Sequence, residues 1–352
     1  MVRGRRTKDG RGSAIRRRVR APALQKEGRG SSRDSRLRDK TVFITGGAGF
    51  IGSAVAERLL PSNRVIIYDN LSRNALPYRH IADHPNLDVV RGDILDVERL
   101  RRALADSAYV IHCAGITGVD TVVKDPVQTM KVNMIGSANV LEAAATLKYC
   151  ARVVCFSTSE VFGPLAYRSE ESSPAVLGVA GQARLTYAVS KLAEEHLAHA
   201  YFKGQGLPTV VLRPFNVYGP GQVGEGALRT FILRALEGEP IHVHGDGTQI
   251  RAWCYIDDMV DAVLLCLVSP RAVGESFNIG NQRAVVTVYG LANAVIRLLN
   301  SKSRIEFVPR PSADIELRVP RVDKAKAVLG FEAKVDLEEG IRRTADSYRR
   351  IL

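Results

Sequence analysis

A short apolar run that ends in a glycine-rich turn constrains this chain more than any other feature. The β-branched run at 41–45 leads directly into Gly46-Gly47-Ala48-Gly49-Phe50-Ile51-Gly52, and an amphipathic stretch follows. Glycines at positions 46, 49 and 52 permit a tight turn, a close approach of the backbone to a ligand, and close packing of a helix on a strand. The positive amino terminus of such a helix attracts phosphates. The sequence therefore predicts a strand, a turn and a helix that together hold a diphosphate.

The same alternation of strand-like and helix-like segments continues to about residue 215. Short apolar runs alternate with stretches whose apolar residues recur at helical spacing, which is typical of βαβ units. Most runs lack polar alternation, as expected for strands that are covered on both faces. We therefore predict an α/β fold with a doubly wound, Rossmann-like parallel sheet. The expected strands are 41–45, 64–68, 87–90, 108–112, 152–156 and 209–212, and the expected helices are 51–60, 97–105, 127–147 and 187–203.

Beyond residue 215 the pattern becomes irregular. Loops rich in glycine and proline interrupt it, and short helical patterns occur near 257–268, 287–300 and 336–350. We expect three parts: a disordered basic tail over residues 1–38, a dinucleotide-binding domain over residues 39–215, and a smaller, irregular carboxy-terminal portion over residues 216–352. The last part should mainly bind substrate at the ligand edge of the sheet.

The net charge of +13 belongs to the first 38 residues. They hold 14 of the 50 basic side chains and 3 of the 37 acidic ones, so the other 314 residues carry 36 basic and 34 acidic side chains. This tail is rich in glycine, serine and arginine and poor in large apolar residues, so we expect disorder. A transit peptide or a translation start further along the chain are alternatives. Nucleic-acid binding is the less favoured interpretation.

The cysteines and the apolar runs exclude several other classes of protein. Five scattered cysteines, without a CxxC pair or a His/Cys cluster, predict reduced thiols, a cytoplasmic location and no metal site. The apolar stretches are far shorter than the roughly 20 residues that a membrane-spanning helix needs. The cysteines are Cys113, Cys150, Cys155, Cys254 and Cys266.

The end of the second expected strand indicates which dinucleotide binds. Asp69 follows Val65-Ile66-Ile67-Tyr68, where a carboxylate can accept hydrogen bonds from both hydroxyls of the adenosine ribose. The same carboxylate would repel a 2′-phosphate, so NAD is favoured over NADP. Arg73, four residues further on, leaves NADP open.

The glycine spacing GxxGxxG, together with Tyr187-Ala188-Val189-Ser190-Lys191, resembles the extended short-chain dehydrogenase/reductase family. The closer resemblance is to its NAD-dependent nucleotide-sugar epimerases, dehydratases and decarboxylases, over roughly residues 40–350. It implies NAD as cofactor, a nucleotide sugar as substrate, with a UDP-sugar favoured, and a homodimer in which 127–147 and 187–203 form a four-helix bundle. The cofactor-binding residues that it implies are Gly46, Gly49, Phe50, Ile51, Gly52, Asp69, Asn70, Asp93, Ile94, Tyr187 and Lys191.

The catalytic residues implied by the resemblance follow the fifth expected strand. Tyr187 and Lys191 lie four apart on one face of an expected helix, where the ammonium can lower the pKa of the tyrosine and make it a usable base. Thr158 matches the catalytic Ser/Thr of the family, and Ser159 follows it. A hydroxyl at the carboxyl end of a sheet strand lies beside the cofactor crevice. A Tyr/Lys pair at this spacing commonly occurs by chance. The prediction therefore depends on the position of this pair, after the fifth expected strand.

Further segments resemble the substrate side of the family. Asn216, in Arg213-Pro214-Phe215-Asn216, would reach toward the diphosphate. Arg251 would pair with the nucleotide phosphates, because a guanidinium matches that anion in shape and charge. Segment 133–136 would steady the active site.

The reaction type depends on a few side chains. Each reaction would begin with hydride transfer from C4 to NAD while Tyr187 takes the hydroxyl proton. Glu160 occupies the position where 4,6-dehydratases and glucuronate decarboxylases carry a working glutamate, and Thr158-Ser159-Glu160 looks most like UDP-glucuronate decarboxylases and GDP-mannose dehydratases. Arg318, in Arg318-Val319-Pro320, resembles the arginine that faces the sugar carboxylate in decarboxylases. An arginine at the surface, or one that faces a phosphate, would fit this sequence equally well.

Decarboxylation is therefore favoured narrowly, and two other classes stay open. The segments 187–193 and 245–248 resemble 4-epimerases of the UDP-glucose or UDP-glucuronate type equally well. A 4,6-dehydratase is the next alternative. A non-enzymatic dinucleotide sensor is the alternative from another class. Such a sensor has no reason to keep Thr158, Tyr187 and Lys191 together, so an enzyme is the stronger interpretation.

Overall fold

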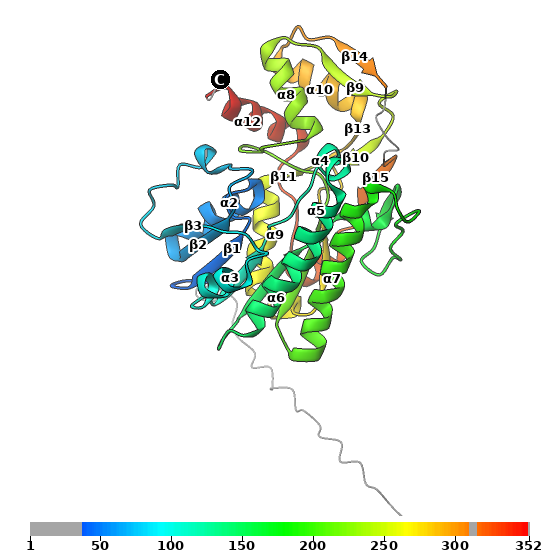
Figure 1. Cartoon of the computed structure of the whole chain (residues 1–352). Helices are drawn as coiled ribbons and strands as arrows, with labels where there is room; N and C mark the ends of the chain where they lie inside the picture. The colour runs from blue at the N-terminus through cyan, green and yellow to red at the C-terminus, as the bar shows by residue number, and fades with distance from the viewer. Residues whose placement is uncertain (1–36, 310–314, 351–352) are drawn as a thin grey trace, which may run out of the picture. The chain divides into compact units, whose positions relative to one another are not determined.

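Parallel strands form the main sheet, in the order β12-β7-β5-β4-β1-β2-β3 (Figure 1). The computed structural model describes residues 37–309 and 315–350, so the expected tail over residues 1–38 lies almost wholly outside the described residues. The chain winds outward from β1 in both directions, which confirms the doubly wound α/β fold. The strands are β1 (Thr41–Thr45), β2 (Arg64–Asp69), β3 (Leu87–Arg91), β4 (Tyr109–His112), β5 (Arg152–Phe156), β7 (Thr209–Pro214) and β12 (Ser276–Ile279).

Helices cover both faces of this sheet because successive strand residues point to opposite sides. In β1, Val42 and Ile44 pack in the core that contains residues of α2 (Phe50–Leu59) and α9 (Ile256–Val268). Phe43 packs in a second core on the other face. Strand β5, which contributes residues to both cores, is buried along its whole length. The helices that line the second core are α3 (Val97–Leu104), α6 (Ser137–Ala145) and α7 (Thr186–Gln205).

The helix expected over residues 127–147 is three consecutive segments. It begins as α5 (Pro126–Met130), where the Asp125 side chain accepts a hydrogen bond from the backbone N–H of Gln128. A π-helical turn, η3 (Lys131–Gly136), then leads into α6. This wider helical turn directs the side chain of Asn133 toward a neighbouring loop. Such π-helical turns occur frequently at functional sites.

The carboxy-terminal portion adds small sheets and also completes the main one. Both β12 and α9 lie beyond residue 215, yet β12 pairs with β7 at the edge of the main sheet. A second sheet has the order β13-β10-β15-β6, from β13 (Val285–Thr287), β10 (Ile250–Ala252), β15 (Leu317–Pro320) and β6 (Leu165–Ser169). Two strand pairs complete the strands of the described part. They are β8 (Val217–Tyr218) with β11 (Cys254–Tyr255), and β9 (Ile241–His244) with β14 (Ile305–Val308).

Shorter helices surround these sheets. The remaining α-helices are α4 (Val119–Lys124), α8 (Ala227–Glu237), α10 (Val288–Leu299), α11 (Asp323–Leu329) and α12 (Leu337–Arg349). The 3-10 segments are η1 (Leu60–Ser62), η2 (Leu76–Tyr78), η4 (Ser159–Phe162), η5 (Ala183–Leu185) and η6 (Pro270–Ala272).

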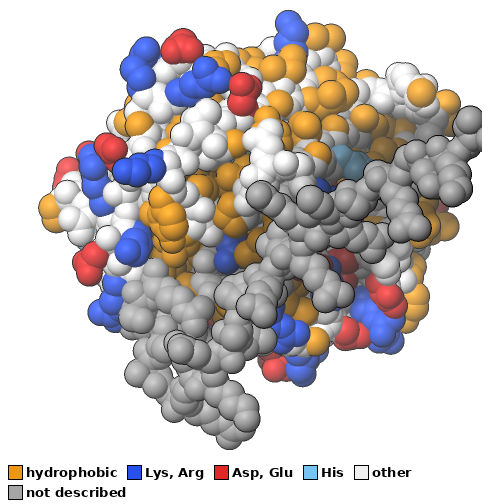
Figure 2. Space-filling model, turned by 90° about the horizontal axis from the view of Figure 1, so that it is seen from below, with side chains coloured by type: hydrophobic (Ala, Val, Ile, Leu, Met, Phe, Trp, Pro, Cys, Tyr) orange, Lys and Arg blue, Asp and Glu red, His pale blue; other side chains and the backbone are white. Residues whose placement is uncertain are grey.

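Charged side chains of both signs are interspersed on the face shown in Figure 2. This agrees with the near balance of 36 basic and 34 acidic residues beyond residue 38. Among the helices of the described ranges, none combines the length and the apolar character needed to cross a bilayer.

Candidate active site

A cavity of about 710 Å³ lies along the carboxyl ends of the main-sheet strands. Its walls come from the glycine-rich turn, from the ends of β2, β3, β4, β5 and β7, and from the carboxy-terminal portion. Every residue that the sequence singles out for the site lines this cavity, except Arg251. Those lining it are Gly46, Gly49, Phe50, Ile51, Gly52, Asp69, Asn70, Asp93, Ile94, Thr158, Ser159, Glu160, Tyr187, Lys191, Asn216 and Arg318.

The turn after β1 has room for a diphosphate and no room for side chains. Gly46 has a φ of +65°, and a Cβ there would lie 2.5 Å from the backbone nitrogen of Ala114. A Cβ on Gly52 would lie 2.4 Å from the oxygen of Gly46, so the helix packs directly on the turn. Gly49 begins α2 without a side-chain cap. The residues present therefore fit the dinucleotide, whose pyrophosphate would face the start of α2.

Asp69 is fixed in place by the turn that it faces. Its Oδ2 accepts from the backbone N–H of Ala48 at 3.0 Å, and its Oδ1 accepts from the N–H of Leu71 at 2.7 Å. Burial raises the pKa of this carboxyl group, although both amides oppose the shift. The side chain lines the cavity, as a group that binds the adenosine ribose would.

Arg73, which left NADP open, takes part in a different contact. Its Nη2 donates to Oγ1 of Thr121 at 2.8 Å, and the carboxylate of Glu225 lies 3.9 Å from the same nitrogen. Glu225 in turn accepts from the N–H and the hydroxyl of Thr121, at 3.1 and 2.7 Å. The guanidinium thus joins α4 to the 219–226 segment, which agrees with NAD as the cofactor.

The expected tyrosine, lysine and threonine lie together at the inner end of the cavity. The side chains of Thr117 and Thr158 act on the phenol of Tyr187 and favour its ionised form. Burial raises the pKa of Tyr187, and the ammonium of Lys191 opposes that shift most strongly. Sequence reasoning missed Thr117, although a hydroxyl in the loop that follows β4 was a usable signal. The cluster can transfer a proton to or from a sugar hydroxyl.

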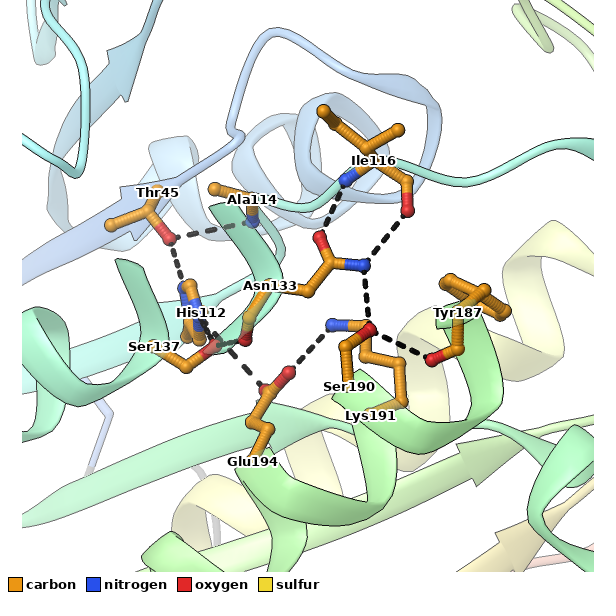
Figure 3. Close-up of polar contacts among 10 residues, drawn as sticks. All are labelled: Thr45, His112, Ala114, Ile116, Asn133, Ser137, Tyr187, Ser190, Lys191 and Glu194. Carbon is orange, nitrogen blue, oxygen red and sulfur yellow. Dashed lines mark hydrogen bonds and ion pairs between the residues drawn. The ribbon is translucent and has the colours of Figure 1, made fainter. Parts of the chain in front are cut away.

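Asn133 holds the loop after β4 against α7 (Figure 3). Its Oδ1 accepts from the N–H of Ile116 at 2.7 Å, and its Nδ2 donates to the oxygen of Ile116 at 3.0 Å and to Oγ of Ser190 at 3.1 Å. Oγ of Ser190 donates to the carbonyl oxygen of Tyr187 at 2.8 Å. The π-helical turn therefore positions the helix that carries the tyrosine.

Two arginines share the carboxylate of Glu160. Nη1 of Arg184 lies 2.7 Å from Oε2, and Nη1 of Arg318 lies 3.6 Å from Oε1. Burial by itself disfavours the ionised carboxylate, but Arg318 and then Arg184 outweigh it and lower the pKa of Glu160. We call Glu160, Arg184 and Arg318 the arginine cluster. In it, two guanidinium groups face one carboxylate.

The two residues expected at the nucleotide are placed differently. Asn216 lines the cavity with a φ of +37°, and its Nδ2 donates to the oxygen of Ala252 at 2.8 Å. Arg251 is buried outside the cavity lining, and its guanidinium donates to the carbonyl oxygens of Ile250 and Ile315. A role for Arg251 at the phosphates stays a prediction.

No metal-binding arrangement is present in the part of the chain that the structure describes. A search of 37–309 and 315–350 finds no group of three His, Cys, Asp or Glu side chains that could hold an ion. The five cysteines are free.

Known proteins resemble this chain over most of its length. The model of the NAD dependent epimerase/dehydratase family matches residues 42–280. The UDP-N-acetyl-alpha-D-glucosaminuronate decarboxylase of Bacillus cytotoxicus is 33% identical over 89% of this chain and 98% of its own length. The UDP-glucuronic acid decarboxylase 3 of Arabidopsis thaliana is 34% identical over 88% of this chain and 89% of its own.

A solved structure shows the same similarity. The UDP-glucuronic acid 4-epimerase of Bacillus cereus, crystallised with UDP-glucuronic acid and NAD, superposes with a TM-score of 0.81. It is 28% identical, and the match covers 89% of this chain and 100% of that one.

Proposed function

This chain belongs to the NAD-dependent epimerase/dehydratase family, and from that premise we propose that it decarboxylates a UDP-hexuronate, UDP-glucuronate above all. The reaction passes through a 4-keto sugar. The single observation that carries the proposal is the arginine cluster in the wall of the cavity, beside the tyrosine that starts the reaction.

The arginine cluster favours a substrate with a carboxylate. Its guanidinium groups carry donors that match a carboxylate in shape and charge. A hexuronate supplies such a carboxylate, whereas a neutral sugar does not. Arg318 is only 5% exposed, so the pairing would form in surroundings where it is strong.

The chain's own residues would carry out the proton transfers. Tyr187 takes the proton of the C4 hydroxyl, and Thr158 holds the reacting oxygen by a hydrogen bond. The glycine turn, Asp69 and Lys191 would hold NAD, which would supply the hydride chemistry at C4. A ketone at C4 lies β to the sugar carboxylate, which Arg318 holds while the C5–C6 bond breaks, carbon dioxide leaves and the electron pair passes to the C4 oxygen as an enolate. C5 then takes up a proton from water, where Glu160 and Ser159 border the site. Tyr187 finally returns its proton to the C4 oxygen.

The direct test is a product analysis. The purified protein is incubated with UDP-glucuronate, and separately with UDP-N-acetylglucosaminuronate, without added reductant. We expect a UDP-pentose or its N-acetylated counterpart, lighter by carbon dioxide, by mass spectrometry and proton NMR. The variant Arg318→Gln is the matched control, because it removes the carboxylate partner and leaves Tyr187 in place. A product of unchanged mass, or no turnover with either uronate, would overturn the proposal.

A UDP-glucuronate 4-epimerase is the second candidate, and the same charge argument supports it. Its substrate carries the same carboxylate, and the Bacillus cereus 4-epimerase has a closely similar fold. The two functions differ in whether the carboxylate survives. An unchanged product mass with an inverted C4 configuration in the NMR spectrum would select the epimerase.

A homodimer is part of the same proposal. The α5, η3 and α6 segments lie beside α7 on one side of the molecule (Figure 1), and apolar side chains there are exposed. Val127 is 64% exposed and Ile135 is 53% exposed, and both lie on this surface. Pairing of these helices with a second copy would form a four-helix bundle. Light scattering should give twice the chain mass, and Val127→Glu together with Ile135→Glu should give a monomer.

A cytoplasmic location is a further part of the proposal. The free cysteines suit a reducing compartment. Fractionation of cells that express the full chain should recover the protein in the cytoplasmic fraction, and recovery elsewhere would contradict this assignment.

A further inference from the structure

A fully buried carboxylate contacts the lysine of the active site from the side away from the cavity (Figure 3). Glu194 lies one turn after Lys191 on α7, and its Oε2 is 2.6 Å from Nζ. The side chain of Glu194 has no exposed surface, and that of Lys191 is 5% exposed. Glu194 does not line the cavity, so substrate and cofactor do not reach it.

A neutral histidine faces the other oxygen of Glu194. Nε2 of His112 lies 4.0 Å from Oε1 and 2.8 Å from Oγ of Ser137, while Nδ1 lies 2.7 Å from Oγ1 of Thr45. Oγ of Ser137 donates to the carbonyl oxygen of Asn133, so the remaining proton between Ser137 and His112 belongs to Nε2. Burial lowers the pKa of His112 to about 3, which keeps the ring neutral.

The other titratable groups around the pair are also uncharged. Cys113 after β4 and Cys155 in β5 are the thiols that interact with it, and burial raises the pKa of both. Burial disfavours the charged form of Lys191, but Glu194 and Tyr187 outweigh it and raise its pKa. Burial raises the pKa of Glu194, which Lys191 and then Ser137 oppose. The ammonium and the carboxylate are therefore the opposing charges of this region.

We propose that Glu194 is a positioning residue that holds Lys191 and cancels much of its charge, and thereby sets the pH range in which Tyr187 exchanges protons. The inference rests on Tyr187 acting as the acid–base group, as in the proposed function, but not on decarboxylation. A lysine alone would stabilise the phenolate strongly. A lysine paired with an anion stabilises it less, because the two fields oppose each other at the phenol oxygen.

The sign of the effect follows from removing the anion. In Glu194→Gln the local potential becomes more positive, so the deprotonated forms of Tyr187 and Lys191 both become more favourable. Both pKa values fall, and both limbs of the pH profile of kcat/KM move to lower pH. We expect a displacement of about one pH unit, the size typical of a neighbouring charge. Glu194→Asp keeps the charge and should keep the profile close to that of the parent protein.

A spectroscopic titration tests the same point without turnover. The tyrosinate absorbance of the purified protein is titrated with base, and the signal of Tyr187 is taken as the difference from Tyr187→Phe. Glu194→Gln should move that signal to lower pH, and Glu194→Asp should not. This readout stays informative even if the chain is a 4-epimerase or does not turn over the uronates, so its failure is separate from failure of the proposed function.

The neighbouring residue provides the control. Glu195 is also buried, but its carboxylate accepts from Arg213 at 2.7 and 3.0 Å and from Ser276 at 2.6 Å. Glu195→Gln should lower the melting temperature and leave the pH profile in place. If Glu194→Gln does not fold, Glu194→Met replaces it, because it removes the same charge without a buried amide to satisfy and should also move both readouts downward. An unchanged or upward-shifted tyrosinate signal would overturn the proposal.

Discussion

Two groups of charges lie near Tyr187, and they differ in access. Glu160 and Arg318 of the arginine cluster line the cavity. The Lys191–Glu194 pair is almost completely buried, and its glutamate does not line the cavity. A charged group that borders a cavity can bind a ligand, whereas a sealed pair contacts only its neighbours in the fold.

The difference separates recognition from acid–base control. The guanidinium of Arg318 can bind a substrate carboxylate, whereas the sealed pair can only adjust the groups beside it. Tyr187 is adjacent to both groups, because its pKa responds to Lys191 and to Glu160. Variants of the two groups should therefore change different measured quantities.

The largest effect is expected where the two groups meet. Tyr187→Phe removes the proton acceptor and keeps the ring, so kcat should fall by about a thousandfold, the range of general acid–base catalysis. The measurement is product formation from UDP-glucuronate, with the melting temperature as a check on folding. A variant with more than a tenth of the parent activity would contradict the assigned role.

Loss of the Arg318 charge should come next. Arg318→Gln removes the guanidinium that we propose binds the substrate carboxylate, and kcat/KM for a UDP-hexuronate should fall by about a hundredfold or more. Binding of UDP-glucose, measured by calorimetry, should change little because it has no carboxylate. Equal losses for both ligands would mean that Arg318 serves the nucleotide or the fold instead.

Arg184 should have a smaller effect, and its sign opposes that of Glu194. Arg184→Gln removes a cation from Glu160, so the pKa of Glu160 rises and any limb of the profile that reports its ionisation moves to higher pH. We expect a loss of about tenfold in kcat/KM, partly restored by Arg184→Lys. A downward shift, as expected for Glu194→Gln, would erase the distinction between the two groups.

The smallest effect should come from added salt, which should distinguish the arginine cluster from the Lys191–Glu194 pair. Added ions enter the cavity and screen the arginine cluster, so KM for the uronate should rise by about two- to fivefold between low and high salt. The sealed pair is not screened, so the pH midpoint of the tyrosinate titration should stay in place. Parallel salt dependence of both quantities would show that solvent reaches the pair.

The sequence predicted the main sheet because covered strands have a strong local signal. Thr41–Thr45 and Arg152–Phe156 have the predicted bounds, since both lie in the middle of the sheet and have apolar centres. Strand β12 was not predicted. Its four residues, Ser276–Ile279, are too short and too polar to stand out, and they join the sheet only through β7.

The site shows the same division between local and tertiary signals. Tyr187 and Lys191 were predictable because a fixed spacing on one helix brings them together. Arg184 reaches Glu160 across 24 positions, and no spacing rule connects a loop residue with the end of a strand. Glu194 was missed because a glutamate on a helix is ordinarily a solvated surface residue, and only the packing of β4 and α6 makes it a buried partner of the lysine.

The π-helical turn at Lys131–Gly136 makes the site sensitive to chain length. An α-helix advances about 100° per residue, and a π-helical turn holds roughly one residue more than an α-helical turn. Deletion of one residue there would restore an ordinary helix while rotating α5 relative to α6 by about that angle. Asn133 would then lose Ile116 and Ser190, so a shortening that secondary structure tolerates would still uncouple the loop from the catalytic helix.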